Sequence, residues 1–278
     1  MPTIKELLTE ARSTLKGPEA WQESELLMEA ICGIERNRQF SHASEELAEE
    51  QVERFKDALR RRIGGEPVAY IIGRRGFWDM ELKVTRDVLI PRPDTECLVE
   101  QALERIPEDV SWQIADLGTG SGAIALAIAR ERPNCEITAT DNSTTALVVA
   151  RENAAVMGLE NIRFVTGSWG QALQNQRFNM VISNPPYIRT DDPHLNQGDL
   201  SAEPQNALLS GTDGLDDIRQ IIADSVLHLN PAGWLLLEHG YEQAAAVSNM
   251  LQLADFNKIF TKMDYGGNDR VSGGRRHT

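Results

Sequence analysis

One apolar run ends in polar groups carried on an unusually stiff turn, Ser183–Tyr187 (SNPPY). The preceding run, Phe178–Ile182, is typical of a strand. Two consecutive prolines end it, because each lacks an N–H and has φ fixed at about −65°. The turn therefore displays the Asn184 amide and the Tyr187 phenol in defined places. Two interpretations are open from these residues alone: a bare Pro-Pro turn, or a rigid mount for an amide and an aromatic ring that take part in chemistry.

A second candidate site is a glycine-rich loop followed by a carboxylate. The loop consists of Gly118, Thr119, Gly120, Ser121 and Gly122. Its glycines let the backbone turn tightly and let a ligand approach without Cβ clashes, but their spacing is not that of the dinucleotide fingerprint. Asp141 ends the next predicted strand about 20 residues further on, where a carboxylate can accept both hydroxyls of a ribose. The alternative role for Asp141 is to cap the helix that follows.

Alternating strands and helices must position both candidate sites. The predicted strands are 113–118, 136–141, 162–167, 178–184, 233–240, 258–264 and 270–276, and the predicted helices are 122–132, 144–158, 214–229 and 242–254. This alternation predicts an α/β fold with a doubly wound, mostly parallel sheet of seven strands. Ligands of such sheets bind beyond the carboxyl ends of the strands, near the switch in strand order. We therefore expect the glycine loop, Asp141 and SNPPY to meet there.

The first part of the chain has a different pattern, with apolar residues at helical spacing. Residues 1–74 are predicted to form a small all-helical domain for substrate recognition, with one helix ending at Gly33 and a third long helix capped near Ser44. Residues 75–111 are predicted to form a hairpin and linker that enters a helix after its prolines. Residues 112–278 are predicted to form the ligand-binding domain.

Composition narrows the class of protein. No apolar run approaches the ~20 residues of a membrane span, and the N-terminus lacks the apolar core of a signal peptide, so we expect a cytoplasmic protein without membrane partners. Cys32, Cys97 and Cys135 are widely spaced and odd in number, so they predict neither a disulfide framework nor a metal site. The formal net charge is −14, and residues 81–278 hold 27 acidic but only 16 basic residues. This charge disfavours a nucleic-acid substrate, whose phosphates need a basic surface.

The glycine loop and Asp141 together resemble the class I S-adenosylmethionine-dependent methyltransferases over roughly residues 112–276. The resemblance implies S-adenosyl-L-methionine as the cofactor, with the loop under its methionine part and Asp141 on its ribose. A residue after the third strand often contacts adenine in that family. Here Ser168 stands where many relatives have an acid. Trp169 can stack on the adenine ring or be a core tryptophan at a strand end.

The SNPPY turn after the fourth strand resembles the motif of enzymes that methylate a planar, conjugated nitrogen. Such a nitrogen is a poor nucleophile because its lone pair is delocalised. The resemblance implies that the Asn184 oxygen and the Pro185 carbonyl each accept one N–H of the target, which aligns the lone pair and stabilises developing positive charge. Pro185 and Pro186 pre-organise these acceptors, Tyr187 can stack on the flat group, and Asn184 also lies beside the cofactor.

The target nitrogen could belong to a nucleic-acid base or to a glutamine. The charge disfavours DNA, and the chain has no evident target-recognition domain of the size that DNA methyltransferases carry. The segment Leu89–Leu103 (LIPRPDTECLVEQAL) closely resembles the HemK family of release-factor glutamine methyltransferases, as do the N-terminal helical domain and the motifs ISNPPYI, DPHLNQGDL, EPQNAL and LLLEHGYEQ.

This resemblance covers essentially the whole chain. It implies methylation of N5 of the glutamine in the Gly-Gly-Gln loop of bacterial class 1 peptide chain release factors, which would be the protein partner, with no direct nucleic-acid substrate. The alternatives are another protein glutamine, such as one in a ribosomal protein, or an exocyclic amino group of a base.

Several residues of these motifs keep two open roles. The segment around the prolines has a purely structural alternative, in which Asp94 or Thr95 caps the following helix. Arg92 could meet the substrate or only pair with an acid such as Glu96, and Glu203 could be structural or touch the substrate loop. His239 follows the fifth strand, where a lone histidine is more often structural than catalytic.

Overall fold

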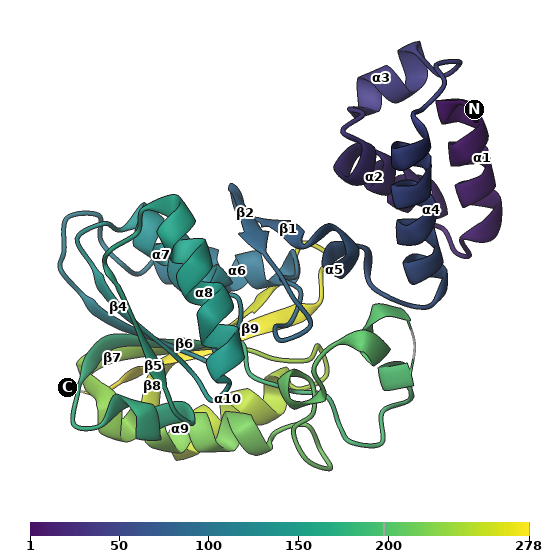
Figure 1. Cartoon of the computed structure of the whole chain (residues 1–278). Helices are drawn as coiled ribbons and strands as arrows, with labels where there is room; N and C mark the ends of the chain where they lie inside the picture. Colours follow the sequence, from purple (N-terminus) through teal and green to yellow (C-terminus); the bar gives the residue numbers. More distant parts are fainter. Residues whose placement is uncertain (197, 278) are drawn as a thin grey trace. The chain divides into compact units, whose positions relative to one another are not determined.

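The structure, a computed structural model, describes residues 1–196 and 198–277 (Figure 1). Gln197, which is part of the motif DPHLNQGDL, and Thr278 therefore lie outside the described residues. The chain forms two compact units. The first comprises Met1–Arg74 and Leu195–Ala202, and the second comprises Arg75–His194 and Glu203–Thr278.

The first unit is helical. Its elements are α1 (Ile4–Thr14), α2 (Ala20–Cys32), α3 (Arg36–Ser41), α4 (Glu49–Ile63), α5 (Val68–Ile72) and the 3-10 helix η3 (Gly198–Ala202). The apolar stripes of the long helices pack together around Phe55, which is fully buried. Helix α2 ends at Gly33 with φ 71°, so the predicted cap is confirmed.

The start of the third predicted helix needs a correction. Helix α4 begins at Glu49, and the cap predicted near Ser44 is wrong. The stretch before α4 is instead bonded to the N-terminal segment: Ile4 N–H donates to the Glu45 carbonyl at 3.0 Å, and Leu47 N–H to the Pro2 carbonyl at 3.2 Å. These long-range bonds compete with helix formation and delay it by several residues.

A hairpin and one helix precede the large sheet. Strands β1 (Arg74–Phe77) and β2 (Met80–Lys83) form the predicted hairpin, and α6 (Asp94–Leu103) follows the prolines. The alternative in which Asp94 or Thr95 caps α6 is wrong, because Asp94 is already its first residue and Pro93, at the cap position, makes no side-chain bond to the helix. The Asp94 and Thr95 side chains bond elsewhere, to Arg270 and Asn184.

The second unit is built on a seven-stranded sheet in the order β5-β4-β3-β6-β7-β9-β8 (Figure 1). Its strands are β3 (Gln113–Leu117), β4 (Glu136–Asp141), β5 (Ile162–Thr166), β6 (Phe178–Ser183), β7 (Leu229–Glu238), β8 (Phe256–Met263) and β9 (Asp269–Arg276). The first five are mutually parallel, and β9 runs antiparallel to both β7 and β8. The predicted doubly wound, mostly parallel α/β fold is confirmed.

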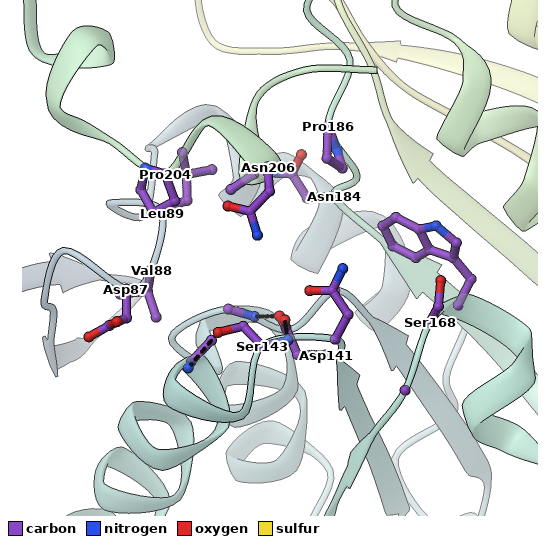
Figure 2. Close-up of a pocket in the computed structure, with 17 residues that line it drawn as sticks. Asp87, Val88, Leu89, Asp141, Ser143, Ser168, Asn184, Pro186, Pro204 and Asn206 are labelled. Carbon is purple, nitrogen blue, oxygen red and sulfur yellow. Dashed lines mark hydrogen bonds between the residues drawn. The ribbon is translucent and has the colours of Figure 1, made fainter. Parts of the chain in front are cut away.

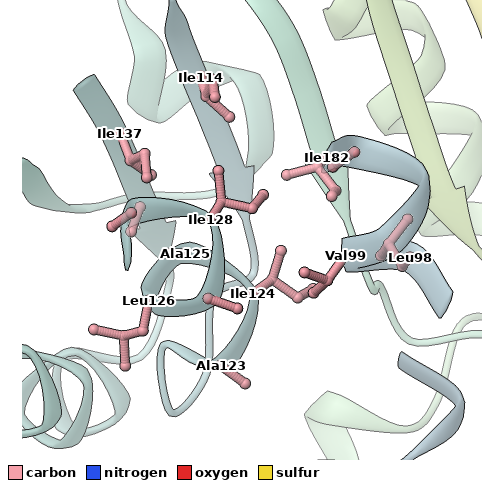
Figure 3. Close-up of a cluster of buried hydrophobic side chains, with 14 of the residues drawn as sticks. Leu98, Val99, Ile114, Ala123, Ile124, Ala125, Leu126, Ile128, Ile137 and Ile182 are labelled. Carbon is pink, nitrogen blue, oxygen red and sulfur yellow. The ribbon is translucent and has the colours of Figure 1, made fainter. Parts of the chain in front are cut away.

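Helices cover both faces of this sheet. They are α7 (Ala123–Glu131), α8 (Thr144–Met157), α9 (Asp216–His228) and α10 (Ala244–Leu253), together with α6. The connecting segments form the 3-10 helices η1 (Trp169–Leu173), η2 (Pro193–Asn196) and η4 (Gln205–Ala207). One core joins α6 and α7 to residues such as Ile114 and Ile182 (Figure 3). A second core joins α9 and α10 to Ala115 and Val181. Neighbouring strand residues enter opposite cores, which explains why these strands are apolar throughout.

The three cysteines, Cys32, Cys97 and Cys135, are all free thiols. Within residues 1–196 and 198–277, His, Cys, Asp and Glu side chains form no group of three or more that could hold a metal ion. No helix in the same part of the chain is long and apolar enough to cross a membrane.

Candidate active site

A pocket lies at the carboxyl ends of β3, β4, β5 and β6. It forms at the switch in strand order, because β3 pairs with β4 on one side and with β6 on the other. Its lining residues are Asp87, Val88, Leu89, Gly118, Gly120, Asp141, Asn142, Ser143, Ala146, Gly167, Ser168, Trp169, Asn184, Pro186, Pro204, Asn206 and Ala207. In Figure 2, Asn184, Pro186 and Asn206 lie on one side of the cavity and Asp141 and Ser143 on the other. The structure thus brings the two candidate sites together.

The glycine loop forms one wall of this pocket. Gly118 and Gly120 have φ of 73° and 55°, which residues with a Cβ rarely adopt. A Cβ on Gly118 would meet the Trp169 ring at 3.0 Å, whereas a Cβ on Gly120 would enter open space. Gly118 therefore allows close packing of the tryptophan. The bare backbone of Gly120 leaves room that a ligand can fill.

Asp141 ties the glycine loop to the next strand. Its Oδ2 accepts from Gly120 N–H and its Oδ1 from Ser143 N–H, both at 2.9 Å. Burial raises the pKa of Asp141, against the opposing effect of these backbone donors. The cap of α8 is Ser143, whose hydroxyl accepts from Ala146 N–H, so the capping alternative for Asp141 is wrong. Asp141 instead lies at the pocket wall, where a ligand hydroxyl can reach it.

The SNPPY turn is held from two sides. The Asn184 side chain donates from Nδ2 to Thr95 Oγ1 on α6 at 3.1 Å, which leaves its Oδ1 free to accept. The Tyr187 hydroxyl donates to Glu238 Oε1 at 3.3 Å, and the Tyr187 carbonyl accepts from Gln243 Nε2 at 3.0 Å. The turn itself contributes Asn184 and Pro186 to the pocket lining, while Tyr187 packs against the second core.

Comparisons with known proteins identify the family. Residues 6–73 match the "PrmC N-terminal domain" and residues 95–203 the "Methyltransferase small domain". The release factor glutamine methyltransferase of Xylella fastidiosa (strain Temecula1) is 47% identical over 99% of this chain and 98% of its own length. The chain belongs to the release factor glutamine methyltransferase family. The relative of the same name from Escherichia coli K12 is 46% identical over 96% of this chain and 97% of its own.

A solved structure supports the fold. The 16S rRNA N2 G1207 methyltransferase of T. thermophilus, in complex with AdoMet and guanosine, superposes with a TM-score of 0.53 at 19% identity, covering 73% of this chain and 50% of that chain. The large unit therefore has the fold of another methyltransferase, and the family model and the relatives show that this chain is a methyltransferase.

Trp169 lies between the pocket and the core in this methyltransferase. Its ring lines the pocket and also packs against the second core. Its φ is 41°, and its Nε1–H donates to Asp217 Oδ1 on α9 at 3.1 Å. A positive φ at a bulky residue costs energy, so this bond and the contact with Gly118 keep the ring at the pocket wall. Ser168 lines the same wall.

Arg92 and Glu203 form an ion pair in the second unit. The Arg92 guanidinium donates to Glu203 Oε1, and Ile90 N–H donates to Glu203 Oε2 at 3.1 Å. The Glu203 side chain is fully buried. This pair fastens the segment before α6 to the segment that brings Pro204 and Asn206 to the pocket. The acid that pairs with Arg92 is thus Glu203 and not Glu96, which instead accepts from Trp78 N–H at 2.8 Å. Glu203 itself has a structural role.

His239 is also structural. It is fully buried, and its Nδ1 lies 2.9 Å from the Gly240 carbonyl, which can only accept, so Nδ1 carries the proton. Its Nε2 then accepts from Ser272 Oγ at 2.8 Å. Burial lowers the pKa of His239, which keeps the ring neutral.

Asn153, on α8, supports the glycine loop, although it is not among the predicted site residues. Its Nδ2 donates to the Ser121 carbonyl at 2.9 Å, and its Oδ1 accepts from Lys83 N–H at 2.7 Å. The side chain thus joins the glycine loop to the hairpin. A polar residue on the apolar face of an otherwise amphipathic helix is the one signal that could have pointed to it.

Asp116, at the end of β3, is fully buried and accepts from Thr119 Oγ1 at 2.6 Å. Burial raises its pKa to about 7. Because the folded pKa lies above the unfolded value, the stability linked to this group is complete below about pH 4 and is lost as the pH rises to about 7. We predict that Asp116→Asn gains stability relative to the parent by about 1.4 kcal/mol per pH unit across this window.

Urea unfolding of both proteins at pH 5, 6, 7 and 8, without donor, measures this difference. The part of the difference in unfolding free energy that is the same at every pH reflects the buried amide group that asparagine introduces, and only the part that changes with pH reports the Asp116 pKa. A difference independent of pH from 5 to 7 would contradict the raised pKa.

Proposed function

We propose that this protein transfers the methyl group of S-adenosyl-L-methionine to N5 of the glutamine in the Gly-Gly-Gln motif of class 1 peptide chain release factors. The observation that carries the proposal is the Asn184 amide, which Thr95 holds with its oxygen free to accept, across one pocket from the glycine loop and Asp141. Family membership supports the substrate, because relatives covering nearly the whole chain bear the name release factor glutamine methyltransferase.

The pocket residues fit the donor. The open space over Gly120 matches a ligand that approaches the backbone closely. Asp141 supplies a carboxylate for the ribose hydroxyls and Trp169 a flat apolar surface for the adenine ring. S-adenosyl-L-methionine bound here would supply an electrophilic methyl group on a sulfonium. Thr119, Ser121 and Gly122 help to fix the conformation of the glycine loop. The Thr119 hydroxyl donates to Asp116, and Gly122 precedes α7.

The chain's own residues position the target amide. Asn184 Oδ1 and the Pro185 carbonyl each accept one N–H of the glutamine side chain, which turns the nitrogen lone pair toward the donor. Both are fixed dipoles, so they stabilise positive charge on the nitrogen as the new N–C bond forms and the C–S bond breaks. Pro185 and Pro186 restrict the turn. The ring of Tyr187 would stack on the flat amide group of the glutamine. The cationic product loses its proton readily, so no strong base is needed.

The helical unit and the net charge complete the proposal. Residues 6–73 match a domain of the same family, and we assign residues 1–74 to holding part of the release factor. The net charge of −14 suits a protein substrate better than a nucleic acid. Release factors act during translation, so the protein would work in the cytoplasm.

A labelled-donor assay tests the proposed function. The enzyme is incubated with methyl-labelled S-adenosylmethionine and a purified class 1 release factor, purified ribosomal proteins, ribosomal RNA or DNA. We expect label in the release factor and none in a release factor whose Gly-Gly-Gln glutamine is replaced by alanine. Label in RNA or DNA, or in the glutamine-less release factor, would contradict the proposal. A labelled ribosomal protein would indicate another glutamine substrate.

A further inference from the structure

The two prolines in the middle of the SNPPY turn have no N–H to donate, so the turn depends on how its ends are held. In the proposed mechanism the Pro185 carbonyl is kept free to accept the target amide. At the near end, the Ser183 hydroxyl donates to a carbonyl of β3 at 2.7 Å, and the Asn184 side chain donates to α6 at 3.1 Å. The place of the Pro185 carbonyl therefore also depends on what holds the far end, Tyr187.

The side chain of Gln243 holds this far end. Its Nε2 donates to the Tyr187 carbonyl at 3.0 Å and to the Gly214 carbonyl, in the segment before α9, at 3.2 Å. Its Oε1 accepts from Gly240 N–H, just after β7, at 2.8 Å. Because a carbonyl only accepts and an N–H only donates, these partners fix which end of the amide faces Tyr187. One partly buried amide thus joins the turn to two other segments of the second unit.

The backbone around the Gln243 amide is closely packed. Gly214 has φ 75°, and a Cβ there would lie 2.3 Å from the Tyr187 carbonyl oxygen and 2.8 Å from Gln243 Nε2. A Cβ on Gly240 would lie 3.1 Å from Gln243 Oε1 and 3.7 Å from Cδ2 of the Tyr187 ring. The two glycines therefore let three segments approach closely enough for one amide to bond to all of them.

The Gln243 side chain bonds to the turn and not to its own helix. Gln243 is at the N-cap position of α10, where a polar side chain commonly accepts from the first N–H groups of the helix. The Gln243 side chain makes no such bond. The same motif, LLLEHGYEQ, supplies Glu238, which accepts from the Tyr187 hydroxyl at 3.3 Å. The ring and the main chain of Tyr187 are thus held by two residues of one motif.

We propose that Gln243 is a positioning residue for methyl transfer: by holding the Tyr187 carbonyl, it fixes the far end of the SNPPY turn and so places the Pro185 carbonyl and the Tyr187 ring against the target amide. This inference rests on the proposed function, in which those two groups meet the glutamine. Gln243 itself does not line the pocket. We therefore expect it to affect the rate of transfer and not the affinity for the donor.

The first test is Gln243→Glu, which keeps the size of the side chain and replaces its N–H donor by an oxygen. The ionised carboxylate can still accept from Gly240 N–H, but its second oxygen faces the carbonyls of Tyr187 and Gly214 and repels them. We expect kcat at pH 8 to fall about 10–100-fold, because displacing a positioned group by about 1 Å can cost about 100-fold. Donor affinity, measured by calorimetry with S-adenosylhomocysteine, and KM for the release factor should stay at parent values.

The pH profile of this variant distinguishes positioning from general damage. The introduced carboxyl group would be partly buried and would face two carbonyl oxygens, so its pKa should lie above the ordinary value of about 4.3. When it is protonated, its O–H can donate to the Tyr187 carbonyl, and the parent's bonding pattern returns. The ratio of the variant's kcat to the parent's should therefore rise about 10-fold as the pH falls from 8 to 5. A ratio that stays the same over this range, or parental kcat at pH 8, would overturn the inference.

Gln252→Glu is the matched control, because Gln252 is an exposed glutamine on the same helix, α10. It adds the same charge, and its kcat should match the parent's at every pH. A Gln252→Glu variant with the pH profile expected of Gln243→Glu would overturn the inference, because the effect would then come from charge on the helix.

Gln243→Met covers the case in which the buried charge prevents folding at pH 8. Methionine has nearly the same length and removes both hydrogen-bonding groups without adding a charge. Its kcat should be low at every pH, with the parent's donor affinity. Parental kcat in this variant would refute the role of Gln243.

These measurements separate the inference from the function on which it rests. A parent enzyme that methylates no release factor refutes the proposed function, whatever the Gln243 variants do. A parent that methylates the release factor, together with fully active Gln243→Glu and Gln243→Met variants, refutes only the positioning role. Circular dichroism and the melting temperature of each variant establish that it is folded before the rates are compared.

Discussion

The Asn184→Ala variant should lose methyl transfer almost completely while it still binds the donor. Removing one pre-organised polar group aimed at developing charge typically costs about 100–1,000-fold in kcat. Asn184 is such a group, because its Nδ2 is held by Thr95 and its Oδ1 is left to accept. Single-turnover transfer from labelled donor to release factor measures the loss, and calorimetry with S-adenosylhomocysteine measures donor affinity.

Asn134→Ala is the matched control for this variant. Asn134 is exposed and precedes β4, so it lies at the amino ends of the parallel strands, whereas the pocket lies at their carboxyl ends. The same substitution there should leave both transfer and donor affinity unchanged. Full transfer activity in Asn184→Ala would contradict the acceptor mechanism. A loss of donor binding as large as the loss of transfer would assign Asn184 to the donor alone.

The Asp141→Ala variant should bind the donor far more weakly. Each hydrogen bond from a ligand hydroxyl to a carboxylate is worth about 1.5–3 kcal/mol, so the loss of two should weaken binding by about 100-fold or more. The variant also loses the bonds from Gly120 and Ser143 to the carboxylate, which loosens the glycine loop. Calorimetry with S-adenosylhomocysteine measures the affinity directly.

A donor analogue separates the ribose contact from the loosened loop. The parent should bind 2′,3′-dideoxy-S-adenosylhomocysteine much more weakly than S-adenosylhomocysteine, and Asp141→Ala should bind both equally. Asp87→Ala removes another pocket carboxylate and should keep the parent's preference for the hydroxylated ligand. A parent that does not discriminate between the two ligands, or an Asp141→Ala variant with parental affinity, would refute the ribose role.

The sequence predicted the fold well because its signals are local. The spacing of the apolar residues and the length of each segment are enough to distinguish the apolar strand Phe178–Ser183 from the helix Asp216–His228. The structure contains both elements. The glycine loop and Asp141 could be paired from spacing, because adjacent parallel strands bring their carboxyl ends together. Errors occurred where a distant contact overrode a local preference, as at Ser44, where bonds to the N-terminal segment delay α4.

The supporting residues of the site could not be predicted, because their partners are far apart in the chain. The sequence suggests only a helix cap for Thr95, whereas its partner Asn184 is 89 positions away. Arg92 and Glu203 are 111 positions apart. In the first unit, Arg62 donates to Asp199 Oδ1 at 2.7 Å across 137 positions. One sequence gives no signal for such pairs. From the sequence, the motif EHGYEQ indicates only that polar residues follow a strand, and not which residues they contact.

The most direct measurement is a structure of the enzyme with S-adenosylhomocysteine and a release factor whose Gly-Gly-Gln glutamine is intact. We predict that the glutamine side-chain nitrogen lies within hydrogen-bond distance, about 3 Å, of both Asn184 Oδ1 and the Pro185 carbonyl, with the donor over the glycine loop. A glutamine amide bound elsewhere, or one whose nitrogen faces the Asn184 NH2 group, would contradict the account.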